Sequence, residues 1–455
     1  MQASRLSLSF SGTLLGIFAL WPLWWALGIE QFLVPAFIIL MALWQIVKNG
    51  GKVTISQPAR WALALAAWAL LPILWVDREY LAIFIKEKLA LWSQAFMLLL
   101  ATTAIKTERQ WWQIVKGLEW ISAYLAVGGI IFVSGLWQGS FISLLGRAIP
   151  AGMRESSAFF GSVANRSFGV AGFENELFTE RLSSFALHFT GLSLAVLLLI
   201  PFLCWRIYWA RGGHRVWRMV VLAGLFVCLL YAQSRVAYVA ASVGLGALVV
   251  FVLGVMHKRN RIGAIGLAAL GIVAGALMVL VAWEAIQQVV RVGLFELRPG
   301  SSLVRMRIYA ETLALLPEHP IAGWGTTIRI PGMRTNYSAG SHSSYLGMLF
   351  QHGVVGLFLY IGLWWSIWRI MLAGVGTANR KHVIGTFWWT MVAAMLAFNI
   401  REAADTWTWD QTLTIIVWSM WALIVSAARL FQAQPLDDRI TQEKAGFLEN
   451  TASVR

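Results

Sequence analysis

The stretch "SAGSHSSYLGMLFQHGVVG" runs from Ser338 to Gly356 and changes character in its middle. Its first half is small and polar, whereas its second half opens an apolar segment that continues to about residue 368. Apolar runs of about 18 or more residues recur along the chain, and a run of that length can cross a membrane as a helix. The stretch therefore predicts a polar loop that leads into a membrane-spanning helix, with His342 at the boundary.

The composition of the chain points to the same class. Of its 455 residues, 59% are hydrophobic and only 13% are charged, whereas a soluble globular protein has roughly 25% charged residues. The 26 tryptophans suit the aromatic belts found at membrane interfaces. Motifs for nucleotide phosphates or zinc do not occur in a usable context, and we expect no cofactor, no metal and no nucleic-acid partner. The predicted fold class is an all-α polytopic membrane protein.

We expect about twelve transmembrane helices of about 20 residues each and two long loops on one side. The predicted spans are 8–28, 30–47, 60–76, 88–105, 117–136, 183–205, 217–232, 236–256, 263–283, 344–368, 384–400 and 411–429. They divide the chain into N-terminal transmembrane helices (1–136), a first outer loop (137–182), central transmembrane helices (183–283), a large outer loop (284–343), C-terminal transmembrane helices (344–429) and a polar tail (430–455).

Positive charge sets the expected orientation. Most of the 36 Lys and Arg residues fall in one set of mostly short connections that includes both termini, so this face should be cytoplasmic. The two long loops lie on the opposite face, and connections of that length are usually functional or disordered. The second loop contains "RMRIYAETLALLPEHP", from Arg305 to Pro320, whose apolar spacing and terminal proline predict an amphipathic helix at the membrane surface.

The two outer loops contain ten arginines and no lysine, namely Arg147, Arg154, Arg166, Arg181, Arg291, Arg298, Arg305, Arg307, Arg329 and Arg334. Arg235 adds another in the short turn "AQSRVAY". A guanidinium binds phosphate or carboxylate in a bidentate way and always stays charged. Attraction to anionic lipid headgroups would explain any single arginine. For the group we favour a specific anionic substrate, because attraction to the membrane surface alone would accept lysine.

Among the seven histidines, His342 is the strongest candidate for a chemical role. Small residues precede it, and Ser343 and Ser344 can cap the following helix. A partly buried, neutral imidazole there could accept a proton. By contrast, His319 lies beside two prolines, where a structural turn is expected, and His188 and His352 fall within predicted spans.

Three motifs occur in order between about residues 180 and 360. The first, "QSRVAYVA", places Arg235 at the start of a span. A weaker match, "RLSSFALHFTGLS", includes Arg181. The second, "SLVRMRIYAETLALLPEHPIAGWG", carries Arg305, Tyr309, Pro320, Gly323 and Gly325. The third, "HSSYLGMLFQHGVVG", carries His342, Tyr345, Leu346, Leu349, Gly353 and Gly356. Together they resemble the signature region of the O-antigen ligase and O-antigen polymerase superfamily, and most of all the O-antigen ligases. Ser343 and Gln351 depart from the usual Asn and acidic residue, and the first third of the chain matches only in hydropathy.

The resemblance implies a metal-independent, inverting glycosyltransferase in the bacterial inner membrane. Such an enzyme moves a glycan from undecaprenyl diphosphate to a hydroxyl of the lipid A–core oligosaccharide on the periplasmic side, among membrane lipids. It implies His342, in the catalytic region of the 284–343 loop, as the general base, a role worth about 10²–10⁴-fold in rate. The implied diphosphate ligands are Arg235 and Arg305, with Arg181 and Arg307 as lesser candidates. Tyr345 and two residues of "REAADTWTWDQ", Arg401 and Asp405, are possible supporting residues, although this segment also fits an ordinary interfacial turn.

Two other functions remain open at this point. A polysaccharide polymerase would share the fold and the donor and differ only in its acceptor. A transporter of lipid-linked glycans would also suit about twelve spans, but it predicts internal repeats and ionisable residues near the middle of the membrane. We find no clear repeat, and the charged residues cluster at one face instead.

Overall fold

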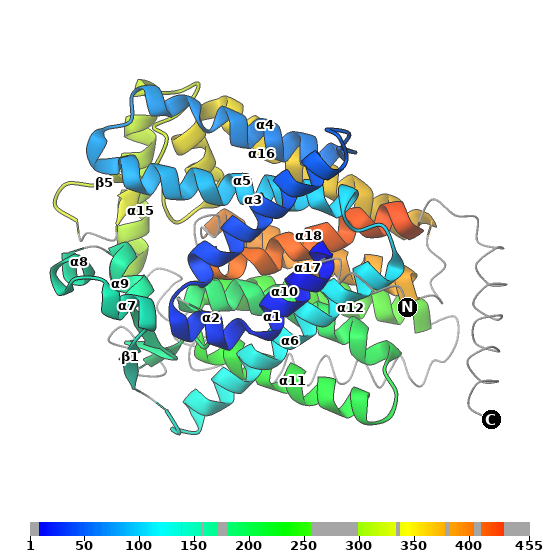
Figure 1. Ribbon diagram of the computed structural model, residues 1–455. Helices are drawn as coiled ribbons and strands as arrows, with labels where there is room; N and C mark the ends of the chain where they lie inside the picture. The colour runs from blue at the N-terminus through cyan, green and yellow to red at the C-terminus, as the bar shows by residue number, and fades with distance from the viewer. Residues whose placement is uncertain are drawn as a thin grey trace, which may run out of the picture.

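The computed structural model describes residues 9–137, 139–156, 158–171, 180–186, 188–256, 299–333, 337–377, 383–404 and 411–431. These residues form a bundle of long helices, with several short helices and two-stranded sheets gathered at one end of it (Figure 1). The elements at that end include α7, α8, α9, β1, α15 and β5.

The described elements alternate between long helices and short connecting elements. The first part of the chain forms α1 (Phe10–Ala19), α2 (Trp21–Leu27), α3 (Glu30–Lys48), α4 (Gln57–Trp68), η1 (Leu71–Leu74), η2 (Arg78–Tyr80), α5 (Leu81–Thr103) and α6 (Glu108–Val133). Short elements follow, namely β1 (Ser140–Ile142), α7 (Leu144–Ala148), α8 (Ala151–Ser156), α9 (Ala158–Ala164), β2 (Asn165–Ser167), β3 (Gly169–Ala171) and β4 (Glu180–Leu182). The remainder comprises α10 (Phe189–Trp209), α11 (Gly212–Tyr231), α12 (Arg235–Met256), α15 (Pro299–Leu315), η3 (Leu316–Glu318), β5 (Ile328–Arg329), β6 (Ser338–Ala339), α16 (Ser344–Thr377), α17 (Val383–Ala404) and α18 (Gln411–Phe431).

The chain is a multi-pass, all-α membrane protein, as its composition predicts. Seven of the described helices are long and apolar enough to cross a membrane, namely α3, α6, α10, α11, α16, α17 and α18. An eighth span results if α1 and α2, which meet at an angle of 65°, count as one. The expected count of about twelve is not confirmed. The helix in the predicted span 60–76 has only 12 residues, α5 carries three charged residues in its first turns, and span 263–283 lies outside the described residues.

Side-chain caps explain where several helices begin. Thr107 and Gln110 form a reciprocal capping box at the start of α6, each side chain accepting a backbone N–H of the other's residue. Ser9 and Ser56 cap α1 and α4, and the side chain of each accepts a hydrogen bond from the backbone N–H three residues further on. At the other end of α2, Gly28 adopts a left-handed conformation (φ +84°), which glycine allows without a steric penalty.

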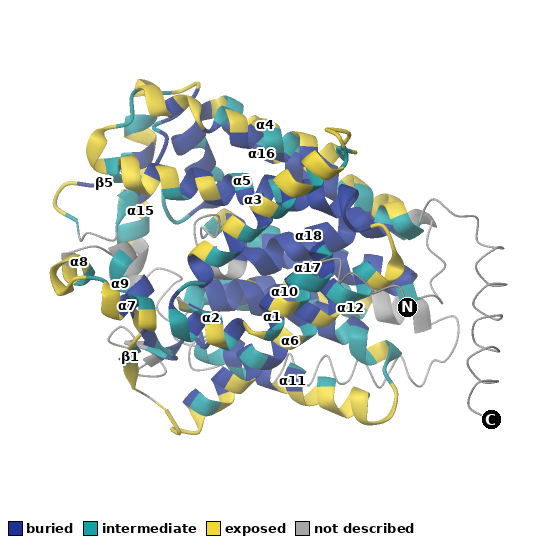
Figure 2. Cartoon of the chain, viewed as in Figure 1, coloured by how far each residue is buried: buried dark blue, intermediate teal, exposed yellow. Residues whose placement is uncertain are grey.

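The core runs through the middle of the bundle, where α10, α17 and α18 are largely buried, while α3, α4 and α11 carry much of the exposed surface (Figure 2). Aromatic rings fill this core. The ring centroid of Trp421 lies 4.2 Å from that of Trp364 and 4.3 Å from that of Trp418, and both pairs pack edge to face. Such pairs add about 0.5–1.5 kcal/mol beyond the area that they bury, so the C-terminal helices form a tightly packed centre.

The described part of the expected first outer loop is tied to the bundle by a buried ion pair. The two hairpins pair β1 with β2 and β3 with β4, both antiparallel. Arg166 of β2 contacts the carboxylate of Glu30, at the start of α3, at 2.9 Å, and both side chains are fully buried. Burial lowers the pKa of the Arg166 guanidinium, and Glu30 opposes that shift. The pair therefore fixes this hairpin against the junction between α2 and α3.

Candidate functional site

The loop that leads into α16 has an unusual backbone at His342. This residue has a φ of +64°, a left-handed conformation that costs a non-glycine residue roughly 1–2 kcal/mol. Three contacts hold the loop there. The hydroxyl of Tyr309 donates to the carbonyl of His342 at 2.8 Å, the N–H of Gly340 donates to the hydroxyl of Thr312 at 2.9 Å, and Ser343 caps α16. Strain maintained in this way is found most often at functional positions.

The helix α15 presents Arg305 and Tyr309 on one face. Arg305 and Tyr309 are four residues apart and so lie on the same side of the helix. While Tyr309 donates to His342, Nη1 of Arg305 donates to the carbonyl of Ala404, the last residue of α17, at 2.8 Å. In contrast, the side chain of Arg307 is exposed. The helix α15 thus brings a guanidinium and His342 to the same region of the bundle.

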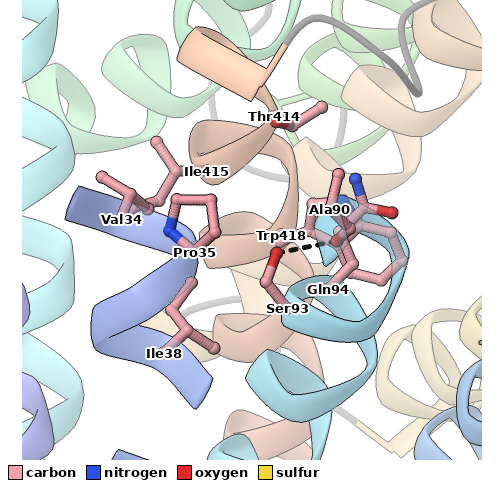
Figure 3. A pocket seen from close by; sticks show the side chains of 9 residues that line it. All are labelled: Val34, Pro35, Ile38, Ala90, Ser93, Gln94, Thr414, Ile415 and Trp418. Atoms are coloured by element: carbon pink, nitrogen blue, oxygen red, sulfur yellow. Dashed lines mark hydrogen bonds between the residues drawn. The ribbon is translucent and has the colours of Figure 1, made fainter. Parts of the chain in front are cut away.

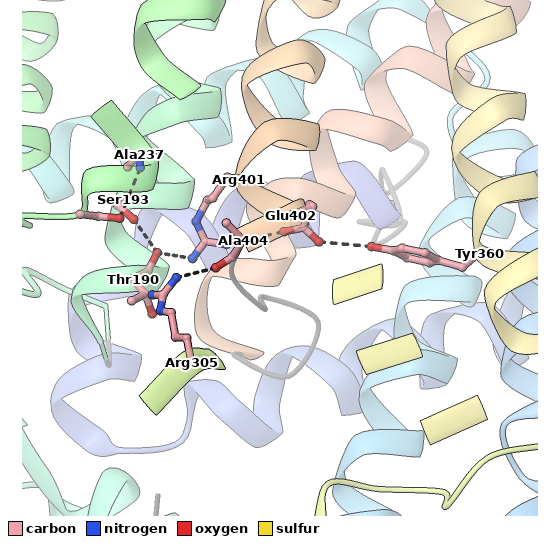
Figure 4. A network of polar contacts seen from close by, with 9 residues as sticks. Thr190, Ser193, Ala237, Arg305, Tyr360, Arg401, Glu402 and Ala404 are labelled. Carbon is pink, nitrogen blue, oxygen red and sulfur yellow. Dashed lines mark hydrogen bonds and ion pairs between the residues drawn. The ribbon is translucent and has the colours of Figure 1, made fainter. Parts of the chain in front are cut away.

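The last turn of α17 supplies a second guanidinium that is fully buried. Arg401 donates from Nη2 to the carbonyl of Thr190, in the first turn of α10, at 2.8 Å, and its Nη1 lies 3.5 Å from the carboxylate of Glu402. Tyr360 of α16 donates to the other oxygen of that carboxylate at 3.2 Å. Figure 4 shows Arg401 between Thr190 and Glu402, with Arg305 reaching Ala404 beside them. The pairing of two buried charges compensates the cost of removing them from water.

A third tyrosine, Tyr345, connects this network to the segment around His342. The ring of Tyr345, in the first turn of α16, packs edge to face on Tyr360 with centroids 5.8 Å apart. Tyr360 in turn contacts Glu402, the neighbour of Arg401. Contacts through Tyr309 and through Tyr345 therefore link the segment around His342 to the end of α17 from two sides.

Arg181, in β4, contacts Phe189, the first residue of α10. The guanidinium of Arg181 is buried and lies 4.2 Å from the ring centroid of Phe189, a cation–π contact. Thr190 follows Phe189 and accepts from Arg401. His188 is the N-cap of α10, and its Nδ1 accepts from the N–H of Thr190. The expectation that His188 lies within a span is wrong, because residues 180–182 form a strand and the helix begins only at Phe189.

Arg235 is the first residue of α12, which packs against both α10 and α17. Gly244 lets α12 approach α17 closely, since an added Cβ there would press on Ala397 and on the backbone of Ala393. Arg235 precedes this contact by nine residues, while Arg401 follows Ala397 by four, so antiparallel packing brings both arginines to the same end of the helix pair. The side chain of Arg235 is half-buried.

The structure thus gathers most of the expected site residues at one end of the bundle. Tyr309 joins His342 to the helix that carries Arg305, and Thr190 joins Arg401 to the segment that carries Arg181. Asp405 lies outside the described residues, as does the cluster around Asp410. Among the described residues, no three His, Cys, Asp or Glu side chains group closely enough to hold a metal ion.

Sequence reasoning missed Glu402, Thr190 and the two tyrosine contacts. Glu402 could have been recognised as an acid beside Arg401 at the end of an apolar run, where an adjacent opposite charge suggests pairing. The contact with Thr190 has no signature in the sequence, because a backbone carbonyl accepts the hydrogen bond and any residue could provide that carbonyl. His319 packs on Trp75 and Trp324, as the expected structural turn requires.

A separate pocket lies between α3, α5 and α18 (Figure 3). Apolar side chains such as Val34, Ile38 and Trp418 line most of it, and the amide of Gln94 lines one side without a hydrogen bond to any described residue. None of the expected site residues lines this pocket. The candidate site is therefore the polar network at the His342 end of the bundle.

Comparison with known families finds a match to part of the chain. Residues 219–361 match the family model described as O-antigen ligase. The match begins in α11 and ends in α16, and it includes Arg235, Arg305 and His342. Over these residues the chain is similar to the O-antigen ligase and polymerase superfamily, as the three sequence motifs predict, and the members of that superfamily are glycosyltransferase-like enzymes acting on lipid-linked glycans. No curated protein was found to match the chain.

Proposed function

We propose that the protein is an O-antigen ligase that transfers a glycan from undecaprenyl diphosphate to a sugar hydroxyl of the lipid A–core oligosaccharide. The observation that carries the proposal is the contact of one helix, α15, with both halves of the site. Its Tyr309 holds the backbone of His342 and its Arg305 reaches the end of α17, where Arg401 lies. A titratable base and a set of guanidinium groups are the parts that this reaction needs.

In the proposed mechanism the arginines act on the donor. Arg305 and Arg235 bind the diphosphate, with Arg181 and Arg307 as further ligands. Charge-assisted hydrogen bonds from guanidinium to phosphate oxygens neutralise the leaving group while the bond from the anomeric carbon to oxygen breaks. Fixed cationic groups of this kind often supply the largest part of a rate enhancement, because they need no reorganisation during the reaction.

His342 acts on the acceptor. Its imidazole takes the proton from the sugar hydroxyl as the oxygen attacks the anomeric carbon from the face opposite the diphosphate, so the configuration is inverted. The left-handed backbone at His342 supports a defined position for the imidazole, because three contacts maintain that conformation against its cost. We place this site on the periplasmic side of the inner membrane, with both termini in the cytoplasm, because the basic connections lie at the other ends of the helices.

The test is a transfer assay with purified protein. The wild-type protein and the His342→Ala variant are each mixed with undecaprenyl diphosphate-linked O-antigen and lipid A–core, in EDTA and without added metal. We expect the lipid A–core band to shift on a gel with the wild-type protein only. A ladder that lengthens on the undecaprenyl carrier instead would indicate a polymerase that uses the same site. Transfer at a near-normal rate by His342→Ala would remove the base from the mechanism.

A further inference from the structure

The helix α16 is broken at Gly353, and a loop fills the break. Gly353 has a φ of +67° and a ψ of −171°, so the helical hydrogen bonds that would cross it cannot form. In a continuous helix the N–H groups of Val354 and Val355 would donate to the carbonyls of Phe350 and Gln351. Phe350 and Gln351 are buried in the bundle, and Val354 and Val355 belong to an apolar helix that can cross a membrane. An unpaired backbone group costs free energy in either environment.

The segment from Pro320 to Gly325 pairs with all four groups. The N–H groups of Trp324 and Gly325 donate to the carbonyls of Phe350 and Gln351 at 2.9 Å and 2.8 Å. The N–H groups of Val354 and Val355 donate to the carbonyls of Pro320 and Ile321 at 2.9 Å and 3.5 Å. The loop therefore replaces one turn of helical hydrogen bonds, and we call this arrangement the α16 splice.

Glycines allow this close approach. An added Cβ at Gly353 would overlap the carbonyl of Ile321, and one at Gly323 would overlap the backbone of Gln351 and His352. Both residues also have a positive φ. Gly323, the first glycine of the Pro-x-x-Gly-x-Gly motif, and Gly353 thus have a packing role in the splice.

Three side chains from the N-terminal part of the chain clamp the splice. The indole of Trp75 donates to the carbonyl of Gly323 at 3.1 Å, and that of Trp68 donates to the carbonyl of His352 at 2.9 Å. Nζ of Lys88, in α5, donates to the carbonyl of Gly325 at 2.6 Å. Each donor therefore satisfies a carbonyl within or beside the splice, and these contacts come from α4, from the residue after η1 and from α5.

Lys88 stands out because it is a buried ammonium, only 3% exposed. Burying a charged group is expensive unless it is paired and hydrogen-bonded. The carboxylate of its neighbour Glu87, also buried, interacts with it electrostatically. A neutral donor could satisfy the carbonyl of Gly325 at lower cost, so the charge indicates that a strong contact is needed here.

We propose that Lys88 is a positioning residue, which holds Gly325 in the α16 splice and thereby fixes the first turns of α16 and His342 at their start. The step to His342 rests on the function proposed above. Between Gly353 and His342 lie only about two and a half turns of helix, and Gly340, two residues before His342, accepts from Gln351 inside the splice at 3.4 Å. A shift of the splice would therefore be transmitted directly to the candidate base.

Two measurements on the full chain test this proposal. The first is hydrogen–deuterium exchange of the peptide that covers residues 320–326, in which the N–H groups of Trp324 and Gly325 donate across the splice. The second is the split between kcat and KM for the lipid-linked donor. Both compare the wild-type protein with Lys88→Met, Lys88→Arg and Trp75→Phe. The last of these keeps an aromatic side chain and loses the N–H that donates to Gly323. Trp24→Phe is the matched control, because it removes an indole donor to the carbonyl of Ile17, away from the splice.

For Lys88→Met we expect exchange of the peptide to rise about tenfold or more, as local opening becomes easier. We expect kcat to fall about 10- to 100-fold, the value of one hydrogen bond from a charged donor, with an unchanged KM. Lys88→Arg should restore part of the protection from exchange and part of kcat. Trp75→Phe should raise exchange and lower kcat by smaller factors. Should Lys88→Met not fold, Trp75→Phe carries the test alone.

Unchanged exchange in Lys88→Met would overturn the clamp, and increased exchange with an unchanged kcat would overturn the link to His342. A loss confined to KM would overturn it as well, because positioning of the base acts on kcat. A wild-type protein without any transfer activity would refute the proposed function instead, and the exchange data would then decide the clamp by themselves.

Discussion

The hydroxyl of Tyr309 donates a hydrogen bond to the backbone carbonyl of His342 across 2.8 Å. The two residues are 33 positions apart in the chain, and the second has a strained, left-handed backbone. Because Tyr309 holds this strained backbone in place, the fold itself determines where the imidazole of His342 lies. Four predictions follow from this contact and from others described above.

Tyr309→Phe should lower kcat for transfer about 2- to 12-fold, since the net value of a hydrogen bond is about 0.5–1.5 kcal/mol. The KM for the donor should stay constant, because Tyr309 is not a proposed ligand of the diphosphate. Initial rates at several donor concentrations measure both. Tyr124→Phe is the control, since its hydroxyl makes the same kind of bond to the carbonyl of Ala19. Equal effects of the two substitutions would contradict a special role for Tyr309.

Arg305→Ala should lower kcat/KM for the donor by about 10²-fold or more, the usual effect of removing one group that stabilises developing charge. Arg305→Lys should restore only part of this loss, because an ammonium cannot reproduce the planar fork of donors. Arg329→Ala serves as the control, since Arg329 is an exposed arginine of β5 in the same segment of the chain. Were Arg329→Ala to cost as much as Arg305→Ala, general surface charge rather than a defined site would explain the arginines.

Glu30→Gln should destabilise the protein by about 3–5 kcal/mol, because it leaves the guanidinium of Arg166 buried without its anion. The double variant Glu30→Gln with Arg166→Met should be more stable than either single variant, since no charge then remains buried. Thermal unfolding midpoints in detergent compare the three. Additive losses in the double variant would show that the two residues act independently.

Gly353→Ala should destabilise the protein by at least about 1–2 kcal/mol from its left-handed backbone alone, with a further cost from overlap with Ile321. Gly246→Ala is a control in a regular part of α12, where an added Cβ meets nothing within 4 Å. That substitution should be neutral or stabilise the helix by about 0.5–1 kcal/mol. Similar unfolding midpoints for the two variants would contradict the importance of the splice.

The sequence predicts the helical architecture well where apolar runs are long and uniform. The predicted spans 344–368, 384–400 and 411–429 coincide with most of α16, α17 and α18. It fails for α5, which begins at Leu81 and not at residue 88, because the first turns of this helix contain the charged residues Lys86, Glu87 and Lys88. Two of these residues are in fact buried, and the partner of Lys88 lies 237 residues away. Hydropathy cannot detect such a partner.

For the candidate site, residue type and motif led to His342, Arg305 and Arg401, because charged groups are rare in an apolar chain and each needs a reason. The contacts that organise them were not predictable. Tyr309 with His342 and Arg401 with Thr190 pair a side chain with a backbone carbonyl over a long distance in sequence, and a carbonyl has no sequence signature. The break at Gly353 was equally hidden, since it lies within an apolar run of helical composition.

The α16 splice has a consequence for how the chain can change in length. Four backbone hydrogen bonds depend on the register between residues 320–325 and residues 350–355. One inserted or deleted residue in either segment would misalign all four, and no neighbouring side chain could compensate. Between the two segments, β5 pairs with β6 in a register of its own, so a change in length is best accommodated in the connection between these two strands. During evolution, relatives should therefore gain and lose residues there, while the two spliced segments keep a fixed length.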